Sequence, residues 1–186
     1  MIAKLPFRPI GNITVDFPDA HLVNSVLYKL IKKYGEESVV GGGRRTEFKF
    51  VVDNKEGYKE LNLLYSWIEG LLPNITFYFA NGDMSRQYDP DLLGFKPEEF
   101  KISESWGIHY SKGEGVLFHN HFPYCLSFVY YLRTPEGSSP LNLDGEELFV
   151  KEGQVIFFFG NQFHCVEENN VDDRCVIAGN IHYNPK

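Results

Sequence analysis

The second half of the chain alternates between short apolar runs and polar turns. The turns include Thr134–Pro140 and Lys151–Gly153. The apolar runs have strand length and lie at 101–110, 116–122, 126–133, 141–150, 154–159 and 174–183. Short strands with this spacing are typical of a β-sandwich or a small barrel. The pattern therefore predicts a mainly β fold, with a barrel core over residues 101–186.

The first hundred residues carry helical patterns. One helix is expected between Asp16, a candidate N-cap, and Gly35, which stops it. Its apolar stripe would consist of Leu22, Val26, Leu30 and Tyr34, widened by Val23, Leu27 and Ile31. A second amphipathic helix is expected over 55–72, ended by Pro73. We treat 1–186 as a single domain, in which a support region of helices and strands, 1–100, packs against the barrel core.

Smaller features of the support region are also predicted. An edge strand is expected within 1–15, a strand over Glu47–Val52, a short strand over Phe77–Phe79 and a long loop over 81–100. The run Gly41–Gly43, followed by two arginines, is similar to a phosphate-binding loop. Such a loop needs a following helix and a Lys-Ser/Thr pair, and here a strand pattern follows. This segment is therefore expected to be a flexible connection.

Composition narrows the function classes. The formal charge of −7 and the isoelectric point of about 5.4 argue against general affinity for nucleic acid or anionic membranes. The three cysteines include no Cys-x-x-Cys pair, which favours a reducing compartment. No signal-peptide pattern and no apolar run of membrane-spanning length is visible. We therefore expect a cytoplasmic protein.

Three histidines form the candidate metal site. His119 and His121 lie in an apolar run and would project to the same face of a strand. Burying them without partners would cost about 1–3 kcal/mol for each unsatisfied group. His164 follows another strand-like run, and three imidazoles suit iron, zinc, copper or nickel. The other histidines, His21, His109 and His182, are expected to lie outside the site.

Arg174 is the candidate anchor for an anion. It shares one face of the last predicted strand with Val176, Ala178 and Asn180. An arginine on a small, apolar face is costly to bury unless it meets an anion, and a guanidinium binds a carboxylate through two hydrogen bonds. If this face lines the barrel interior, a small molecule with a carboxylate is the expected partner. If the register differs by one residue, Arg174 lies in solvent.

Taken in order, these residues resemble the Fe(II)/2-oxoglutarate-dependent oxygenases, specifically the prolyl-hydroxylase-like group. The resemblance covers roughly residues 101–186 and rests on six features. They are Tyr110, nine residues before His119; the His119–His121 segment, where the family has H-x-D; Val129–Leu132 with Tyr131; Asp144–Phe149, similar to a family hairpin; the Gly153–Phe159 run before His164; and Arg174.

The resemblance implies a double-stranded β-helix, a jelly-roll or cupin-like barrel with supporting helices. It implies Fe(II) held by His119, His121 and His164. It also implies 2-oxoglutarate bound through Arg174, helped by Tyr131 and Tyr110, with O₂ as the oxidant and hydroxylation of a substrate that the sequence does not identify. One departure is clear, because His121 replaces the family's carboxylate. Three neutral ligands leave the metal its full charge, which is expected to raise its redox potential.

Two other classes of protein fit part of the pattern. A three-histidine cupin dioxygenase that does not use 2-oxoglutarate would also explain the H-x-H segment. A non-catalytic jelly-roll binding module with a structural zinc is the third interpretation. Structural zinc sites usually draw on cysteine, and Cys165 is expected to point away from His164 on a regular strand.

Overall fold

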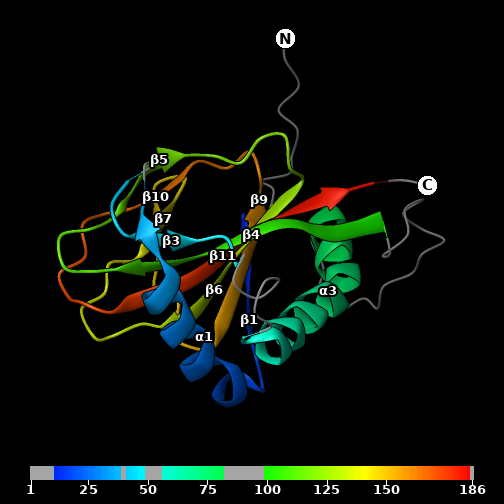
Figure 1. Cartoon of the computed structure of the whole chain (residues 1–186). Coiled ribbons are helices and arrows are strands. Elements are labelled where there is room, and N and C mark those ends of the chain that lie inside the picture. The colour runs from blue at the N-terminus through cyan, green and yellow to red at the C-terminus, as the bar shows by residue number, and fades with distance from the viewer. Residues whose placement is uncertain (1–10, 39–40, 49–55, 82–98, 185–186) are drawn as a thin grey trace, which may run out of the picture.

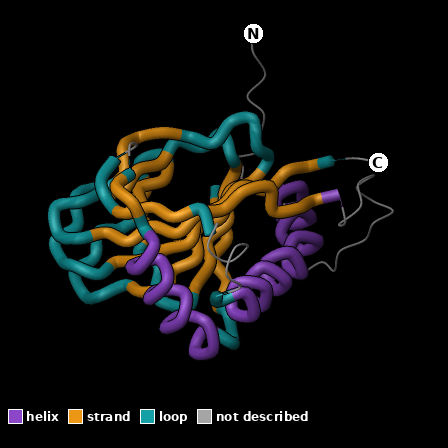
Figure 2. The backbone as a smooth tube through the Cα atoms, viewed as in Figure 1, coloured by secondary structure: helices purple, strands orange, loops and turns teal. Residues whose placement is uncertain are grey.

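The computed structural model of the chain describes residues 11–38, 41–48, 56–81 and 99–184, and these form two sheets backed by two helices (Figures 1 and 2). The elements in order are β1 Asn12–Asp16, α1 Ala20–Tyr34, β2 Glu36–Glu37, β3 Arg44–Thr46, α3 Tyr58–Asn81, β4 Phe100–Tyr110, β5 Val116–His119, β6 Leu126–Arg133, β7 Leu141–Leu143, β8 Glu146–Leu148, β9 Gln154–Phe159, β10 His164–Val166 and β11 Arg174–Tyr183. The prediction of a mainly β fold with helices in the support region is confirmed.

The larger sheet has seven strands in the order β1-β9-β6-β11-β4-β3-β2, and the smaller has four in the order β5-β10-β7-β8. All pairings are antiparallel. Strands β1, β2 and β3 come from the support region, yet they extend the sheet formed by the core strands. The single-domain organisation stays a prediction, which this shared sheet supports.

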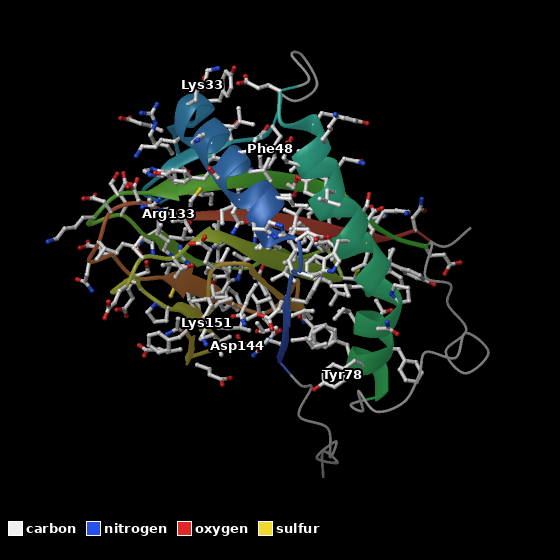
Figure 3. All side chains as sticks on the ribbon, turned by 90° about the horizontal axis from the view of Figure 1, so that it is seen from below. Lys33, Phe48, Tyr78, Arg133, Asp144 and Lys151 are labelled. Atoms are coloured by element: carbon white, nitrogen blue, oxygen red, sulfur yellow. The ribbon has the colours of Figure 1, made fainter. Side chains whose placement is uncertain are left out.

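Side-chain alternation along β6 divides the apolar residues between two cores. Phe128 and Tyr130 point to the outer face of the larger sheet and pack in the core that includes the helices. Val129 and Tyr131 point to the opposite face, where side chains of both sheets form a second core. Figure 3 shows α1 and α3 lying across the strands of the larger sheet. The helices therefore support one face of this sheet, and the other face lines the barrel interior.

The position and the buried face of α1 differ from the prediction. The helix begins at Ala20, because Asp16 ends β1, where its carboxylate accepts a hydrogen bond from Gln154 Nε2 at 2.9 Å. Leu22 and Val26 of the predicted main stripe are exposed, and of that stripe Leu30 is buried. The three residues expected only to widen the stripe, Val23, Leu27 and Ile31, are all buried. Ile31 fits closely over Gly107 of β4, where a Cβ atom would come within 2.5 Å of its side chain.

The second helix is longer than predicted. Pro73 was expected to end it, but α3 continues to Asn81, so the strand expected over Phe77–Phe79 is wrong. The Thr76 hydroxyl donates to the Leu72 carbonyl at 2.7 Å. Ile75 and Phe77 are buried, with 3% and 2% of their surfaces exposed. Tertiary burial outweighs the local preference of these apolar residues for a strand.

Some strand boundaries also differ. The run 141–150 is a hairpin of β7 and β8, in which Asp144 and Gly145 form the turn with φ of 51° and 90°. Asp-Gly is a strong signal for such a turn. Strand β10 was not predicted. The strand expected over 47–52 is wrong for Glu47 and Phe48, which follow β3 and lie in no strand. Residues 49–52 lie outside the described residues, as do 1–10 of the predicted edge strand and 82–98 of the predicted loop.

Neither of the two described helices combines the length and the apolar character that a membrane-spanning segment needs.

Candidate metal centre

Strand pairing brings two of the predicted metal ligands together. In the antiparallel pair of β5 and β10, His119 lies directly opposite His164. His121 lies beyond the end of β5, so the prediction that both residues of the H-x-H segment lie on a strand is wrong for His121. Its backbone N–H donates to the Gly160 carbonyl at 2.7 Å, which fixes the turn that carries it.

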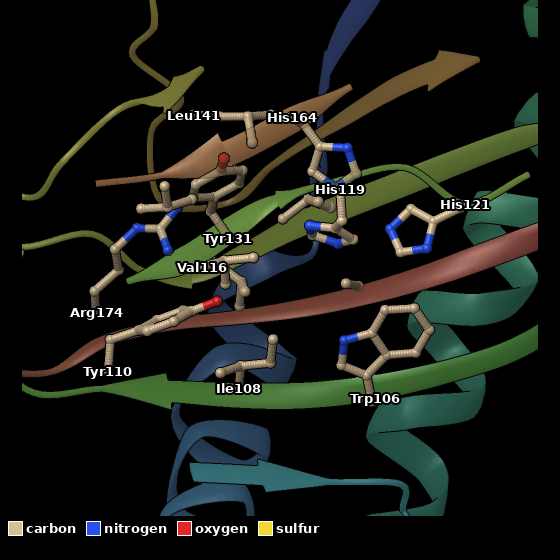
Figure 4. A pocket seen from close by; sticks show the side chains of 14 residues that line it. Trp106, Ile108, Tyr110, Val116, His119, His121, Tyr131, Leu141, His164 and Arg174 are labelled. Carbon is tan, nitrogen blue, oxygen red and sulfur yellow. The ribbon is translucent and has the colours of Figure 1, made fainter. Parts of the chain in front are cut away.

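The three imidazoles converge on one point. Their candidate ligand nitrogens all lie within 4.8 Å of one another. The ring centroid of His164 is 4.3 Å from that of His119 and 5.0 Å from that of His121. Figure 4 shows the three rings grouped at one part of the cavity. In the described part of the chain, this cluster contains no carboxylate, so its donors are three nitrogens.

The environment keeps two of these imidazoles neutral. Burial lowers the pKa of His121 to about 3, and the neighbouring His164, His119 and Arg45 act in the same direction. Burial and His119 lower the pKa of His164 to about 4. A neutral imidazole has a nitrogen lone pair that can bind a metal.

Backbone carbonyls orient two of the rings. His119 Nδ1 lies 2.7 Å from the Leu117 carbonyl, and His164 Nδ1 lies 3.3 Å from that of Gln162. Because a carbonyl only accepts hydrogen bonds, Nδ1 carries the proton in each contact and Nε2 is left as the metal-binding nitrogen. The arrangement fits a metal site of the H-x-H type.

Arg174 occupies the other end of the cavity. The register of β11 places it beside Tyr110 of β4, and its neighbour on the same face, Val176, beside Tyr131 of β6. Only 1% of its surface is exposed. Its Cζ atom lies 5.0 Å from the Tyr110 ring centroid and 5.4 Å from that of Tyr131. Arg174, Val176 and Ala178 line the cavity, so of the two orientations that the sequence left open for this face, the structure has the inward one.

Buried polar atoms at this end lack partners. Among the described residues, Arg174 Nε and Nη1 and the Tyr131 hydroxyl have no hydrogen bond. Burial raises the pKa of Tyr131, and it raises that of Tyr110 to about 12, although the positive charge of Arg174 opposes both shifts. Both phenols therefore keep their protons at neutral pH and can donate to an anion.

One aromatic residue of the site was not predicted. Trp106 lines the cavity, and its ring centroid lies 5.6 Å from that of His121 (Figure 4). Alternation along β4 places Trp106, Ile108 and Tyr110 on one face, and this signal was available in the sequence. The histidines expected outside the site are outside it: His109 Nε2 contacts Asp173 at 2.9 Å, and the side chains of the other two do not belong to the cluster.

No family model and no curated protein matches this sequence, but solved structures do. A prolyl-4-hydroxylase from Pseudomonas putida matches with a TM-score of 0.63 and 15% identity over 94% of both chains. An oxidoreductase of the 2OG-Fe(II) oxygenase family from Burkholderia pseudomallei matches with a TM-score of 0.62 and 16% identity, over 96% of this chain and 90% of the other. The chain has the fold of the 2OG-Fe(II) oxygenases. This fold is the double-stranded β-helix.

A third match shows that the shared fold includes the support region. The non-haem α-ketoglutarate-dependent epimerase SnoN from nogalamycin biosynthesis matches with a TM-score of 0.64 and 11% identity, over 96% of this chain and 82% of the other. The resemblance read from the sequence covered only residues 101–186. The fold that this resemblance implied is confirmed, and the structural similarity extends over nearly the whole chain. Because proteins of one fold catalyse different reactions, the function has to be argued from the site.

Proposed function

We propose that this protein is a non-haem Fe(II)- and 2-oxoglutarate-dependent dioxygenase that hydroxylates a substrate not yet identified. The observation that carries the proposal is Arg174, buried and incompletely paired, in the same cavity as three clustered histidines. An unpaired buried guanidinium is costly, whereas a carboxylate satisfies it through two charge-assisted hydrogen bonds. The fold of the matching oxygenases supports the same conclusion.

In this proposal, His119, His121 and His164 hold the iron. When bound, the iron supplies the oxidising chemistry with 2-oxoglutarate and O₂, and the protein supplies binding and orientation. Because all three ligands are neutral, the histidines leave the full +2 charge of the metal uncompensated. This charge favours the binding of an anionic cosubstrate beside them.

Arg174 and the two tyrosines would orient 2-oxoglutarate. The guanidinium pairs with the carboxylate distant from the metal, and the unpaired Tyr131 hydroxyl donates a hydrogen bond to it. Tyr110 lies on the other side of the guanidinium. Apolar residues between the two ends, including Val116, Val129 and Leu141, exclude water from the cavity and thereby strengthen these charge interactions.

The direct test is spectroscopic. Fe(II) and 2-oxoglutarate, added together without oxygen, are expected to give a visible charge-transfer band as the keto acid chelates the metal. Arg174→Met should weaken 2-oxoglutarate binding strongly and retain the metal. Arg133→Met is the matched control, because Arg133 is an exposed arginine whose guanidinium lies over the Tyr28 ring, outside the cavity. Equal 2-oxoglutarate affinity in the wild type and Arg174→Met would contradict the proposal.

A three-histidine dioxygenase that does not use 2-oxoglutarate is the second candidate. The all-nitrogen cluster favours it. Arg174 argues against it, since such an enzyme leaves the buried guanidinium without a role. Oxygen consumption that needs iron but not 2-oxoglutarate would favour this candidate.

A structural zinc module has less support. The free Cys165, next to His164, does not belong to the cluster. Zinc that is bound tightly and stoichiometrically, with no iron, in protein purified without chelators would favour the module.

The cellular location is proposed to be the cytoplasm. All three cysteines are unpaired, although two of them are only partly buried. Free thiols of this kind are typical of proteins in a reducing compartment.

A further inference from the structure

A second cavity opens on the two histidines of the H-x-H segment. It has a volume of about 240 Å³, and we call it the outer chamber. Its wall includes His119 and His121 and three other side chains that bear on recognition: Arg45, Glu104 and Trp106. Arg174 lines the cavity described above and does not line the outer chamber. A molecule in the outer chamber therefore reaches the metal centre without occupying the proposed cosubstrate site.

Arg45 is held in the outer chamber by strand pairing. It lies opposite Ile108 in the pair of β3 and β4, and its Cζ atom lies 4.4 Å from the centroid of the Trp106 ring. The Gly42 N–H donates to the Gly115 carbonyl at 3.0 Å and ties the preceding turn to the barrel. This turn is the glycine segment that the sequence analysis set aside as a flexible connection, and it positions a charged side chain beside the metal centre.

The guanidinium of Arg45 is available to a ligand. In the described part of the chain its Nε is buried and has no hydrogen-bond partner. Within the described residues, its one ion pair joins Nη2 to Glu47 Oε1 at 3.2 Å, and 74% of the Glu47 side chain is exposed. Exposed pairs of this kind are weak, so a carboxylate of a ligand can replace Glu47.

Glu104 supplies the opposite charge. It precedes Trp106 by two residues on β4 and therefore lies on the same face. Its Oε1 accepts a hydrogen bond from Asn180 Nδ2 at 2.7 Å, and Asn180 Oδ1 accepts one from Ser127 Oγ at 2.8 Å. Asn180 and Ser127 are buried and hold the carboxylate of the exposed Glu104 in place. Among the described residues, its second oxygen has no hydrogen-bond partner and is open to a ligand. No hydrogen bond or ion pair joins Glu104 to Arg45 in the described structure, although both line the outer chamber.

From this arrangement we infer that the primary substrate is a small zwitterion of amino-acid type. Its carboxylate pairs with Arg45, its ammonium group pairs with Glu104, and the rest of the molecule faces the histidines. A ligand with only a negative charge would be repelled by the Glu104 carboxylate, and a ligand with only a positive charge would be repelled by the Arg45 guanidinium. The chamber is smaller than the 300–1,000 Å³ typical of sites for drug-sized ligands, which also favours a small molecule. The inference rests on the proposed function, because it assigns this molecule the role of substrate.

The test uses three forms of each amino acid and the full chain loaded with Zn(II) and 2-oxoglutarate. The free L-amino acids, their C-terminal amides and their N-acetyl derivatives are compared by ligand-observed saturation-transfer NMR. At least one free amino acid is expected to bind. Its amide and its N-acetyl form are each expected to bind at least tenfold more weakly. Each derivative removes one of the two charges, so the comparison tests the two pairings separately.

Variants connect the binding to the outer chamber. Arg45→Met and Glu104→Gln are each expected to weaken binding of the free amino acid at least tenfold. Glutamine is chosen at position 104 because its side-chain carbonyl can still accept the hydrogen bond from Asn180. Arg44→Met is the matched control, because Arg44 is the preceding residue on β3 and its Nε donates to the Gly35 carbonyl at 2.8 Å, outside the chamber. The control should bind within about twofold of the wild type.

Four results would overturn the inference: no free amino acid binds, the amides bind equally well, the N-acetyl forms bind equally well, or Arg45→Met binds like Arg44→Met. Equal binding of N-acetyl forms would indicate an anionic ligand such as a peptide carboxy terminus. The charge-transfer band is measured on a second portion of the same purified protein, in which Fe(II) takes the place of Zn(II). Amino-acid binding without the band would refute the proposed function, whereas the band without amino-acid binding would refute only the inference.

Discussion

Replacing Arg174 by methionine is expected to make the ligand-free protein more stable. Two buried guanidinium nitrogens lack partners, and each such group costs about 1–3 kcal/mol. Cation–π contacts with the rings of Tyr110 and Tyr131 offset this cost by about 0.5–2 kcal/mol each. Methionine keeps the apolar contacts of the side chain and removes the charge. The net gain in the free energy of unfolding is therefore about 1–2 kcal/mol, which raises Tm by about 2–8 °C in a chain of this size.

Adding 2-oxoglutarate should reverse this order. At one hundred times its Kd, a ligand of the native state stabilises the wild type by about 2.7 kcal/mol, and it should stabilise Arg174→Met hardly at all. The assay is thermal unfolding of Zn(II)-loaded protein with and without 2-oxoglutarate. Arg133→Met should respond like the wild type.

Two results would refute this reasoning. If the ligand-free variant is less stable than the wild type by more than about 1 kcal/mol, the guanidinium of Arg174 already has favourable partners within the protein and does not need a bound anion. If 2-oxoglutarate raises the Tm of the variant and of the wild type equally, the carboxylate binds elsewhere.

Three further predictions concern the metal, an ion cluster and the core. His121→Ala should weaken Zn(II) binding at least about 100-fold in a chelator competition, whereas the exposed His21→Ala should not change it. Hydrogen bonds from Lys32, His109 and Tyr28, in that order of effect, hold the pKa of Asp173 below its usual range. The charged carboxylate therefore stabilises the folded protein at neutral pH. Asp173→Asn should cost about 1 kcal/mol in urea unfolding at pH 7, and the difference should shrink below about pH 4. Leu27→Ala should cost about 2–5 kcal/mol and Leu22→Ala less than about 0.5 kcal/mol, because only Leu27 is buried.

Each of these has an outcome that contradicts it. Unchanged zinc affinity in His121→Ala would remove that residue from the ligand set. A destabilisation by Asp173→Asn that does not shrink at all between pH 4 and pH 2 would mean that the carboxylate charge is not its cause. The asparagine is a suitable replacement because residue 173 has a φ of 69°, a conformation that asparagine tolerates. Equal losses for the two leucine variants would contradict the buried face of α1.

The inner end of the site could be predicted because strand alternation is a local property. Alternation along β11 puts Arg174 on one face with Val176 and Ala178, but it left open whether that face points inward. Tyr131 on β6 was identified through the family resemblance. His121 shows the limit of the rule. Its ring joins the cluster from a turn, and that turn depends on a hydrogen bond to Gly160, which no local pattern encodes.

The outer chamber and the second helix were missed for related reasons. Arg45 lies on a strand of only three residues after a glycine run, and it meets Trp106 through the register of β3 on β4. In α3, the proline and the aromatic residues after it favour an end to the helix and a new strand, yet Ile75, which packs in the core shared with the sheet, and Phe77 are buried as parts of the helix. In both places long-range contacts determine the structure, and a single sequence does not display them.

The two halves of the barrel differ in what supports them. Arg174 lies on a ten-residue strand in the sheet that α1 and α3 cover, whereas His164 lies on a three-residue strand of the smaller sheet. No residue of a described helix belongs to the core between the two sheets, so no such helix supports the smaller sheet there. Local opening is easier where fewer buried contacts must be broken. Amide hydrogens of β10 should therefore exchange with solvent sooner than those of β11, and warming should release the metal before the helix-backed half melts.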